Sequence, residues 1–391
     1  MLFLVLMAFN ITHKDKKTNA RVGILQTKSG AIETPFFMPV ATKATTKFIN
    51  SQQLEEMKIK AVISNAFILS LRPGKEVIKK VGDLGKFMNF SGVNFTDSGG
   101  FQMYSEYLYL KSDDSGVWFK NPISGETIFM TPEKNMDIQL DIGADVAMCL
   151  DTMPLYGQSK KDILQAVERT VAWAERCKKE HDRLQKKVPQ KRRQLLFSIS
   201  QGGIYSDLRK HCVEQLLKYD FDGFAIGGVA LPEQLYGGNI EDVKKQEQEI
   251  IRVHKKIVPE NKICYLMGEG DPLWMLDAIA LGVDCFDSRF PTQSARRGSL
   301  LTWQGKLKIL NKQYTFDQKP IDKNCKCFAC KNYTRSYIRH LLKEDEAVGK
   351  ELASYHNLFF MNELIEKAKE AIKKKKFSVF KNKIEKIFSK K

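Results

Sequence analysis

The sequence predicts an α/β fold, a (β/α)8 TIM-like barrel with an antiparallel hairpin insertion and a C-terminal helical module. Short β-rich runs alternate with amphipathic helical stretches along most of the chain, as in parallel α/β folds. Polar residues follow these runs in turn, as they do at the mouth of a barrel. From Asn311 the chain becomes polar, then Cys-rich, then Lys- and Glu-rich, which indicates a module boundary.

Three parts follow from this pattern: an N-terminal segment (1–19), the barrel (20–314), and the module with a basic helical tail (315–391). Hydrophobic residues at 43% and charged residues at 28% exclude disordered, collagen-like and membrane classes. The opening residues MLFLVLMAF lack a basic region and a cleavage site and are too short to cross a bilayer. We expect a cytoplasmic protein without a membrane partner, with Met7 as a second candidate start.

The net charge of +17 indicates a polyanionic partner such as nucleic acid. It is concentrated at the end of the chain, where residues 364–391 hold eleven Lys against three Glu. This tail has two interpretations, an electrostatic handle for the partner or a solvated lysine-rich helix.

Seven β-rich runs are the predicted strands. They cover residues 60–64, 93–96, 145–150, 195–200, 222–226, 263–266 and 283–286. The clearest helix between them covers 160–179, because apolar residues recur on one face from Ile163 to Ala174. Ser159 and Asp162 form a capping-box pattern at its start. Residues 117–130 predict an antiparallel hairpin that turns near Gly125 and interrupts the barrel pattern.

A chemically useful residue follows the end of each predicted strand. These residues are Asn65, Asp97, Asp151, Gln201, Gly228, Met267 and Asp287. In a (β/α)8 barrel the carboxyl ends of all strands face one mouth, where active sites are found. A single Asp at such a position more often caps the next helix. Three carboxylates and two amides that converge from distant parts of the chain favour a functional site instead.

We expect catalysis at this mouth to use carboxylates and no metal ion. None of the six His follows a predicted strand, which argues against a catalytic metal centre there. Two carboxylates suffice for glycosidic exchange, because one attacks the anomeric carbon while the other protonates the leaving group. Asp284 stands three residues before Asp287, so strand alternation turns it to the opposite face, where we expect a structural role.

Three of the eight cysteines, Cys325, Cys327 and Cys330, fall within six residues in a C-x-C-x-x-C pattern typical of metal binding. A tetrahedral site needs a fourth ligand, and the spacing allows either His340 or His356. Four protein ligands would close the site, so we expect a structural zinc ion, one per chain, in the C-terminal module.

Five motifs carry a resemblance to a known family. They are FTDSGGFQ around Asp97, ISQGG around Gln201, AIGGVALPE around Gly228, YLMGEG around Met267 and FDSRFPTQSARRG around Asp287. In order and spacing, and together with the Cys cluster, they resemble the tRNA-guanine transglycosylases of the bacterial, queuosine type. The similarity runs from about Ala20 to Phe380.

The resemblance implies exchange of the wobble-position anticodon guanine for a 7-deazaguanine base, with 7-aminomethyl-7-deazaguanine favoured. Asp287 would attack the ribose and hold the tRNA covalently, and Asp97 would act as general acid/base. The remaining implied substrate contacts are Asp151, Gln201, Gly228, Ser98, Phe101, Met267 and Asn65. Phe101 and Met267 would sandwich the base, as expected for a base flipped out of its loop.

The resemblance also implies partners. The substrate would be a tRNA with a U-G-U anticodon loop, contacted by Arg296 and Arg297. The family's histidine lies in an His-Asn dipeptide, which matches His356 and leaves His340 on a helix surface. Members of the family commonly form homodimers, which the sequence neither proves nor excludes here.

Several positions depart from the family pattern. Leu231 favours a compact 7-substituent, while Phe67 and Ile68 replace a Tyr-His pair behind the pocket. Gln293 stands where an Arg is usual, and Glu269 is unusual beside the pocket. The alternatives are a queuine-inserting enzyme, an archaeosine-type enzyme, which would ordinarily carry further RNA-binding domains, and a non-catalytic tRNA-binding partner subunit. The presence of all three aspartates favours catalysis over the last.

Overall fold

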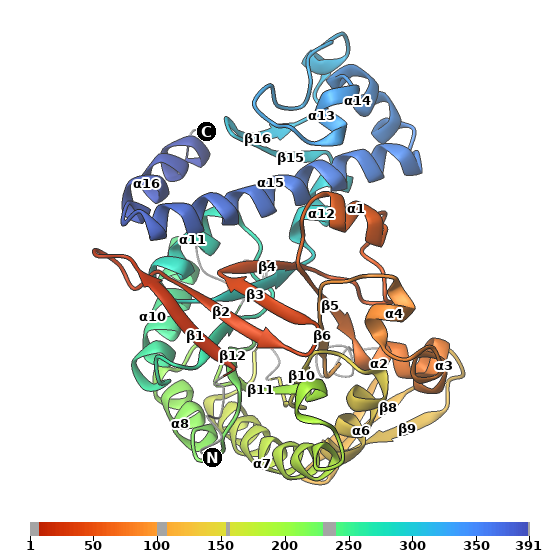
Figure 1. Ribbon diagram of the computed structural model, residues 1–391, viewed down its shortest axis with the longest axis vertical. Coiled ribbons are helices and arrows are strands. Elements are labelled where there is room, and N and C mark those ends of the chain that lie inside the picture. Colours follow the sequence, from red (N-terminus) through yellow and green to blue (C-terminus); the bar gives the residue numbers. More distant parts are fainter. Residues whose placement is uncertain (1–7, 100–107, 154–156, 230–239, 390–391) are drawn as a thin grey trace.

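The computed structural model describes residues 8–99, 108–153, 157–229 and 240–389 and contains a barrel of parallel strands (Figure 1). The strands are β4 (Phe36–Pro39), β5 (Ala61–Asn65), β6 (Val93–Asp97), β10 (Val146–Met148), β11 (Leu195–Ser200), β12 (Gly223–Ile226), β13 (Ile263–Leu266) and β14 (Cys285–Ser288). β14 pairs in parallel with β4, and a parallel bridge between Val40 and Ile63 joins the end of β4 to β5. The bridge connects the two ends of the strand order, so the sheet is closed and the predicted barrel is confirmed.

All seven predicted strands are present, with ends shifted by no more than two residues. The sequence does not predict β4, the strand that completes the barrel. Pro35 and Pro39 stand before and at the end of its short apolar run, and proline is normally taken as a strand breaker. The strand forms because Phe36 N–H donates to Asp284 O, so that pairing with β14 begins immediately after Pro35.

Helices form the outer layer of the barrel. They are α1 (Ser51–Glu56), α2 (Ala66–Leu69), a π-helical turn (Ser70–Gly74), α3 (Lys75–Val81), α4 (Leu84–Met88), α6 (Pro132–Ile142), α7 (Lys160–Gln185), α8 (Ser206–Leu216), α10 (Ile240–Ile257), α11 (Pro272–Ala280) and α12 (Phe290–Arg296), with a 3-10 turn at Gln190–Arg192. In α7 the predicted stripe is buried against the sheet and the Ser159–Asp162 capping box is present. The helix continues to Gln185, beyond its predicted end at residue 179.

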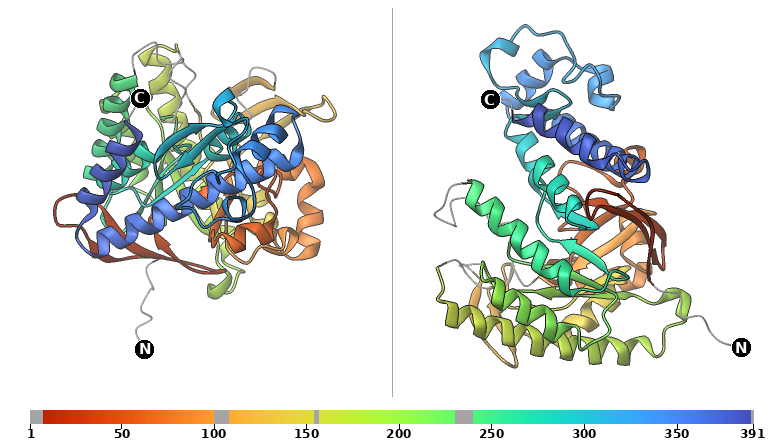
Figure 2. Two further views of the ribbon diagram at one scale, coloured as in Figure 1. Left: turned by 90° about the horizontal axis from the view of Figure 1, so that it is seen from above. Right: turned by 90° about the vertical axis from the view of Figure 1, so that its left-hand side faces the viewer.

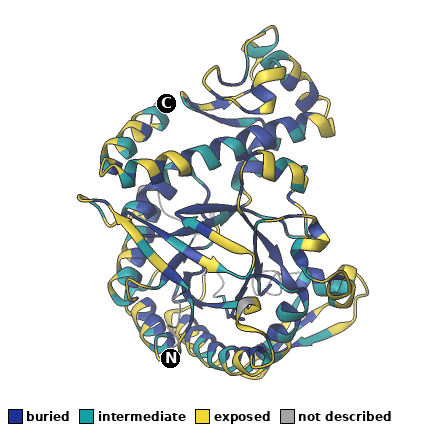
Figure 3. Ribbon diagram, viewed as in Figure 1, coloured by how far each residue is buried: buried dark blue, intermediate teal, exposed yellow. Residues whose placement is uncertain are grey.

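The strands of the barrel are buried along most of their length (Figure 3). Apolar side chains fill the barrel interior. The Phe95 ring lies within 6.2 Å, centroid to centroid, of the rings of Phe36, Phe197 and Tyr265, which come from three other strands. A second apolar cluster fills the space between the sheet and the outer helices. Because the interior is solid, a substrate can bind only at an end of the barrel.

A three-stranded antiparallel sheet that the sequence analysis missed covers the amino end of the barrel. Its strands are β1 (Phe9–Lys14), β2 (Arg21–Thr27) and β3 (Gly30–Thr34). Phe9, Leu25 and Ile32 from this sheet belong to the same apolar cluster as the barrel interior. The other end therefore remains as the open one.

The predicted hairpin insertion is confirmed and gains one strand. β8 (Gly116–Lys120) and β9 (Thr127–Met130) pair antiparallel around a turn that contains Gly125, and β7 (Tyr109–Asp113) pairs with β8. Trp118 stacks on Phe129 on this sheet. Trp173 and Arg176 of α7 donate to Asp114 O and so fix the insertion to the outer layer.

The C-terminal region lies against one side of the barrel (Figures 1 and 2). It contains β15 (Ser299–Thr302), β16 (Gly305–Lys308), a 3-10 turn (Lys312–Tyr314), α13 (Phe328–Asn332), α14 (Arg335–Lys343), α15 (Ala347–Lys373) and α16 (Phe377–Phe388). Asn357 of α15 bonds to backbone groups of Leu301, Pro291 and Ser299, which ties the helix to the chain leaving β14. We keep the three-part division, with its boundary at 314/315, as a proposal. Among the described residues, no helix is both long and apolar enough to span a bilayer.

Asp284 has the structural role that alternation predicts. Its carboxylate accepts from Arg21 Nε and Nη2 at 2.8 and 2.6 Å and from Cys264 N at 2.7 Å, and both charged side chains are buried. The pair joins the N-terminal sheet to the barrel.

Replacing Asp284 by Ala is expected to destabilise the protein by about 3–5 kcal/mol, because it leaves the Arg21 guanidinium buried without a counter-charge. Urea unfolding followed by circular dichroism measures the loss. Glu260→Gln is the matched control: this carboxylate pairs with Lys14 at the surface, so a change within about 1 kcal/mol is expected. Equal losses in the two variants would contradict the role of the buried pair.

Candidate active site

The structure brings the residues that follow the predicted strands to the carboxyl end of the barrel. Asn65 and Asp97 end β5 and β6, Asp287 lies in β14, and Gln201 and Met267 directly follow β11 and β13. Asn65 Nδ2 donates to Asp97 Oδ2 at 3.3 Å. Phe101 lies outside the described residues, so its predicted stacking role stays a prediction.

Asp287 is half-buried and is held by two neutral donors. Tyr265 Oη donates to its Oδ1 at 2.5 Å, and Gly268 N–H donates to the same oxygen at 2.9 Å. Burial raises the pKa of Asp287, and these two hydrogen bonds and the charge of Arg289 oppose the rise. Among the described residues no donor bonds Oδ2, so this oxygen is available to react.

Asp97 has a different environment. Burial, together with the charges of Asp151 and Asp287, raises its pKa to about 7, although the backbone N–H groups of Gly99 and Ser98 oppose the rise. Asp97 and Asp287 are therefore close enough to interact electrostatically. The two neutral donors favour the ionised form of Asp287, while Asp97, with its pKa of about 7, binds a proton near neutral pH. Such a pair can supply a nucleophile and an acid at the same time.

A third carboxylate, Asp151, lies near Asp97 and is bonded to an amide side chain. Asp151 Oδ2 accepts from Gln201 Nε2 at 2.6 Å, and burial raises the pKa of Asp151 to about 6. Gln201 Oε1 is buried without a hydrogen-bond partner among the described residues. This set of aligned donors and acceptors suits the edge of a planar, nitrogen-rich ring.

Glycine is required next to the Gln201 side chain. Gly228 has φ +63°, and a Cβ built on it would lie 2.8 Å from Gln201 Oε1. A Cβ on Gly227 would lie 2.6 Å from Gln201 Nε2. The Gln201 amide thus packs directly on the backbone of residues 227–228, and any larger residue there would displace it.

The other predicted substrate residues support this arrangement. Asn65 Oδ1 accepts from Ile68 N at 2.8 Å, which caps α2 and orients the amide toward Asp97. Ser98 is buried, and Asn135 Nδ2 donates to its carbonyl oxygen. Met267 is half-buried directly before Gly268, so its thioether lies on the loop that holds Asp287.

The positions that depart from the family pattern have physical explanations in part. Phe67 is fully buried and meets the ring of Phe119 edge-on at 4.5 Å, so an apolar contact with the insertion stands behind Asn65. Glu269 is buried, and its Oε1 accepts from Asp271 N at 2.6 Å. Burial and the nearby charge of Glu247 raise the pKa of Glu269. Glu269 therefore stiffens the loop that carries Gly268. Nothing in the structure explains Gln293.

A basic cluster lies beside Asp287. Arg289 and Arg297 are exposed, and Arg296 is half-buried with its guanidinium 5.9 Å from the centre of the Phe48 ring. Among the described residues, none of the three arginines forms an ion pair with an acidic side chain. Burial and the two neighbouring arginines lower the pKa of Arg296. Unpaired guanidinium groups at the mouth suit an anionic ligand.

Two residues of the mouth were missed by the sequence analysis. Tyr265 is the closest partner of Asp287, and its only signal was its place two residues before Met267, at the start of the YLMGEG motif. Arg289 follows the FDS run directly and had no periodic signal of its own.

Cys325, Cys327, Cys330 and His356 form a buried cluster whose ligand atoms all lie within 4.8 Å of one another and could hold a metal ion. His356 Nδ1 lies 3.5 and 3.3 Å from the sulfur atoms of Cys327 and Cys330. A tetrahedral zinc would separate sulfur from nitrogen by about 3.5 Å, given bonds of about 2.3 and 2.0 Å. His356 Nε2 lies 2.8 Å from Leu301 O, which fixes the tautomer with a free Nδ1. His340 is exposed on α14.

The chain is similar to known proteins over nearly its whole length. The family model described as Queuine tRNA-ribosyltransferase matches residues 15–390. A protein named Queuine tRNA-ribosyltransferase from Lysinibacillus sphaericus (strain C3-41) is 42% identical over 372 residues, covering 95% of this chain and 93% of its own. The proteins of the same name from Halothermothrix orenii and Thermoanaerobacter sp. (strain X514) are 42% and 41% identical, and each comparison covers at least 94% of both chains.

Proposed function

Since the chain belongs to the queuine tRNA-ribosyltransferase family, the tRNA-guanine transglycosylases, we propose that it exchanges the wobble-position guanine of tRNA for a 7-deazaguanine base through a covalent intermediate on Asp287. One observation carries the proposal. Two carboxyl groups share the barrel mouth, Asp97 with a pKa of about 7 and Asp287 with two donors on a single oxygen.

The exchange proceeds in two displacements. Asp287 Oδ2 attacks C1′ of the ribose, the C1′–N9 bond breaks, and the guanine leaves with the proton of Asp97. The incoming base then gives its N9 proton to Asp97 and attacks C1′, which releases Asp287. Because C1′ is inverted twice, its configuration is retained. The bonds from Tyr265 and Gly268 hold the nucleophile in one orientation throughout.

The base binds by its polar edge. The Asp151 carboxylate accepts from ring and exocyclic N–H groups, while Gln201 and the backbone at Gly228 bond to the neighbouring carbonyl. Met267 on one side and Phe101 on the other sandwich the ring. Asn65 and Ser98 orient Asp97. The support for this assignment is the buried Gln201–Asp151 bond and the close packing of Gln201 on residues 227–228.

The RNA lies over the basic cluster. Arg296 and Arg297 contact the U-G-U anticodon loop, and the lack of acidic partners for them supports this role. The enzyme acts in the cytoplasm in queuosine biosynthesis, as a homodimer if it follows the family's common assembly. Of the 7-deazaguanines, 7-aminomethyl-7-deazaguanine is the first candidate, on the strength of Leu231, which lies outside the described residues. Queuine is the alternative base, and an archaeosine-type reaction or a scaffold role is the alternative function.

The metal is a structural zinc ion. Three thiolates and one imidazole make a complete tetrahedral set, which leaves no position for water and therefore no catalytic role. Zinc would join α13, which carries Cys330, to α15, which carries His356, and so hold the C-terminal region in place.

Asp287→Ala is expected to abolish exchange of labelled guanine into tRNA, because no other group can hold the ribose. Wild-type protein mixed with tRNA should give an adduct that survives denaturing electrophoresis, and Asp287→Asn should give none. The matched control is Glu260→Gln, which removes a carboxylate at the surface, away from the barrel mouth. Folded wild-type protein that exchanges no guanine with any tRNA would favour the scaffold role.

The pKa of Asp97 predicts opposite pH dependences for the two half-reactions. Adduct formation needs the protonated carboxyl group, so its single-turnover rate should fall about tenfold per pH unit above about pH 7. Resolution of the adduct by an added base needs the carboxylate and should slow as the pH falls below about 7. Quenched-flow experiments on labelled tRNA measure both rates. In Asp97→Asn both rates should drop by about 10²–10⁴ and should lose this dependence on pH. Wild-type rates that do not change with pH would contradict the role of Asp97 as general acid/base.

Removal of zinc should destabilise the C-terminal region without blocking the chemistry directly. Atomic absorption should find one zinc per chain in wild-type protein and none in Cys330→Ala, with a lower melting temperature. Cys177→Ala is the control, because this thiol is buried outside the cluster and should leave the zinc content unchanged. Zinc retained by Cys330→Ala would contradict the ligand set.

A further inference from the structure

Helix α8 carries a buried arginine close to the proposed base-binding residues. Arg209 is 1% exposed and belongs to the buried stripe of this helix, together with Cys212, Val213 and Leu216. A guanidinium in such a position is costly to bury unless its N–H groups are bonded within the fold. The acceptors that it uses therefore indicate why an arginine stands there.

The guanidinium of Arg209 bonds to the backbone of two loops at the barrel mouth. At the loop that follows β11, Ser200 O accepts from Nη1 and Gly203 O accepts from Nε, each at 2.9 Å. At the loop that follows β12, Gly227 O accepts from Nη1 at 2.8 Å and Gly228 O accepts from Nη2 at 3.4 Å. One buried side chain thus joins carbonyl oxygens of both loops.

The pairing of the two strands ends where these bonds begin. β11 and β12 pair in parallel as far as Ser200 and Ile226, and Gly227 N–H then donates to Ser200 O at 3.1 Å. Beyond this point the guanidinium continues the connection, because its planar fork of donors suits several carbonyl oxygens at once. The first loop also lies directly on the helix, since a Cβ built on Gly202 would lie 2.8 Å from Arg209 N.

These bonds determine where Gln201 lies relative to Gly228. The Gln201 amide packs on the backbone at Gly228 and donates to Asp151 at 2.6 Å, so a shift of either loop would change the groups that meet the base. The exchange adds a requirement of its own. Guanine leaves and a second base enters while the tRNA stays bound to Asp287, so the pocket must keep its shape when it is empty.

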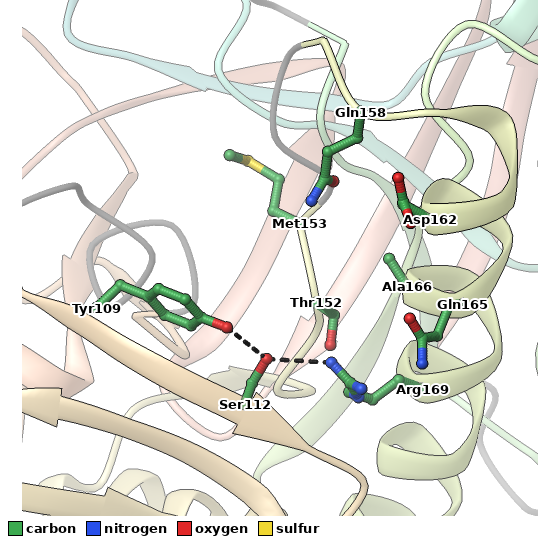
Figure 4. A pocket seen from close by; sticks show the side chains of 9 residues that line it. All are labelled: Tyr109, Ser112, Thr152, Met153, Gln158, Asp162, Gln165, Ala166 and Arg169. Carbon is green, nitrogen blue, oxygen red and sulfur yellow. Dashed lines mark hydrogen bonds between the residues drawn. The ribbon is translucent and has the colours of Figure 1, made fainter.

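Another neighbour of Gly228 gives less support. Met153 Cγ lies 3.7 Å from the position of a Cβ built on Gly228. Figure 4 shows Met153 among the side chains that line a hollow between β7 and α7, where Tyr109 and Arg169 both bond to Ser112. A thioether side chain adapts easily to its surroundings. The guanidinium is therefore the more rigid contact of this loop.

We propose that Arg209 is a positioning residue for base recognition, which holds the loop of Gln201 and the loop of Gly228 at a fixed separation in both half-reactions. The inference rests on the proposed base exchange and deepens it. It explains how two residues that are far apart in the sequence present one binding edge to the base.

Arg209→Lys tests this role, because it keeps the charge but offers one nitrogen in place of three and cannot replace the bonds of Nε, Nη1 and Nη2 together. With saturating tRNA, the KM for labelled guanine should rise by roughly tenfold to a hundredfold, the loss of one or two hydrogen bonds from a charged group. The value of kcat at saturating guanine should not change. The KM for tRNA should not change either, because phosphate contacts supply most of its affinity.

Two further measurements separate positioning from general damage to the fold. The pKa of about 7 at Asp97 arises from burial and from two neighbouring aspartates, so the pH dependence of adduct formation should be the same in Arg209→Lys as in the wild type. Arg21→Lys is the matched control, because Arg21 is also buried and bonds to carbonyl oxygens, but at the N-terminal sheet. This control should lower the stability and leave the guanine KM unchanged.

An unchanged guanine KM in Arg209→Lys, or an equal rise in Arg21→Lys, would overturn the role. If Arg209→Lys does not fold, hydrogen exchange of the tRNA-free wild type decides. The amides of 200–203 and 226–229 should then exchange more slowly than those of the exposed turn at 122–125, and equal rates would overturn the role.

Failure of the proposed function gives a different result. In that case folded wild-type protein exchanges no base with any tRNA, and equilibrium dialysis of guanine against tRNA-free protein tests Arg209 separately. Weaker binding of guanine by Arg209→Lys than by the wild type would support the positioning role. Equal binding by the two proteins, or no binding by the wild type, would overturn it.

Discussion

The closure of the parallel sheet is the constraint on which the site depends. Asp287 lies in β14 and Asp97 ends β6. In one direction around the sheet these two strands are separated by β13, β12, β11 and β10, and in the other direction only by β4 and β5. The shorter connection exists because the bridge between Val40 and Ile63 joins β4 to β5 and closes the sheet. Without it, β14 and β6 would lie far apart in an open sheet, and the Asp287 charge could not raise the pKa of Asp97. A short strand bounded by prolines, in which Met38 lies opposite Asp287, thus brings the two carboxyl groups together.

Burial has opposite consequences for two aspartates at β14. Asp284 and Asp287 are three residues apart and face opposite sides. Asp284 is paired with the Arg21 guanidinium, so its charge is neutralised and it joins two sheets. Asp287 receives only a phenol and a backbone N–H, and its nearest charged neighbours include other carboxyl groups. The first arrangement stabilises the fold. The second leaves carboxyl groups with raised pKa values, which is unfavourable for stability and is the usual signature of a site that moves protons.

The sequence predicted the parts of the fold and site that depend on local pattern. Asp97 and Asp287 could be singled out because each ends an apolar, β-rich run. Tyr265 could not, since its bond to Asp287 depends on the register of β13 against β14, in which Tyr265 lies opposite Cys285. The choice between His340 and His356 was likewise open on spacing alone, because it depends on α15 passing beside α13. The N-terminal sheet was missed for the same reason: its apolar residues meet the barrel interior only after the chain has folded.

Three of the eleven lysines of the basic tail form ion pairs with acidic side chains outside the tail. Lys369 and Lys373 of α15 both approach Glu33 of the N-terminal sheet, and Lys381 of α16 pairs with Asp277 of α11 at 2.7 Å. Lys369 is almost fully buried. These lysines fasten the tail to the barrel, so their charges are largely compensated before any RNA arrives. The arginines that follow β14 have no such acidic partners among the described residues. A polyanion therefore gains more from these unpaired arginines than from the paired lysines of the tail.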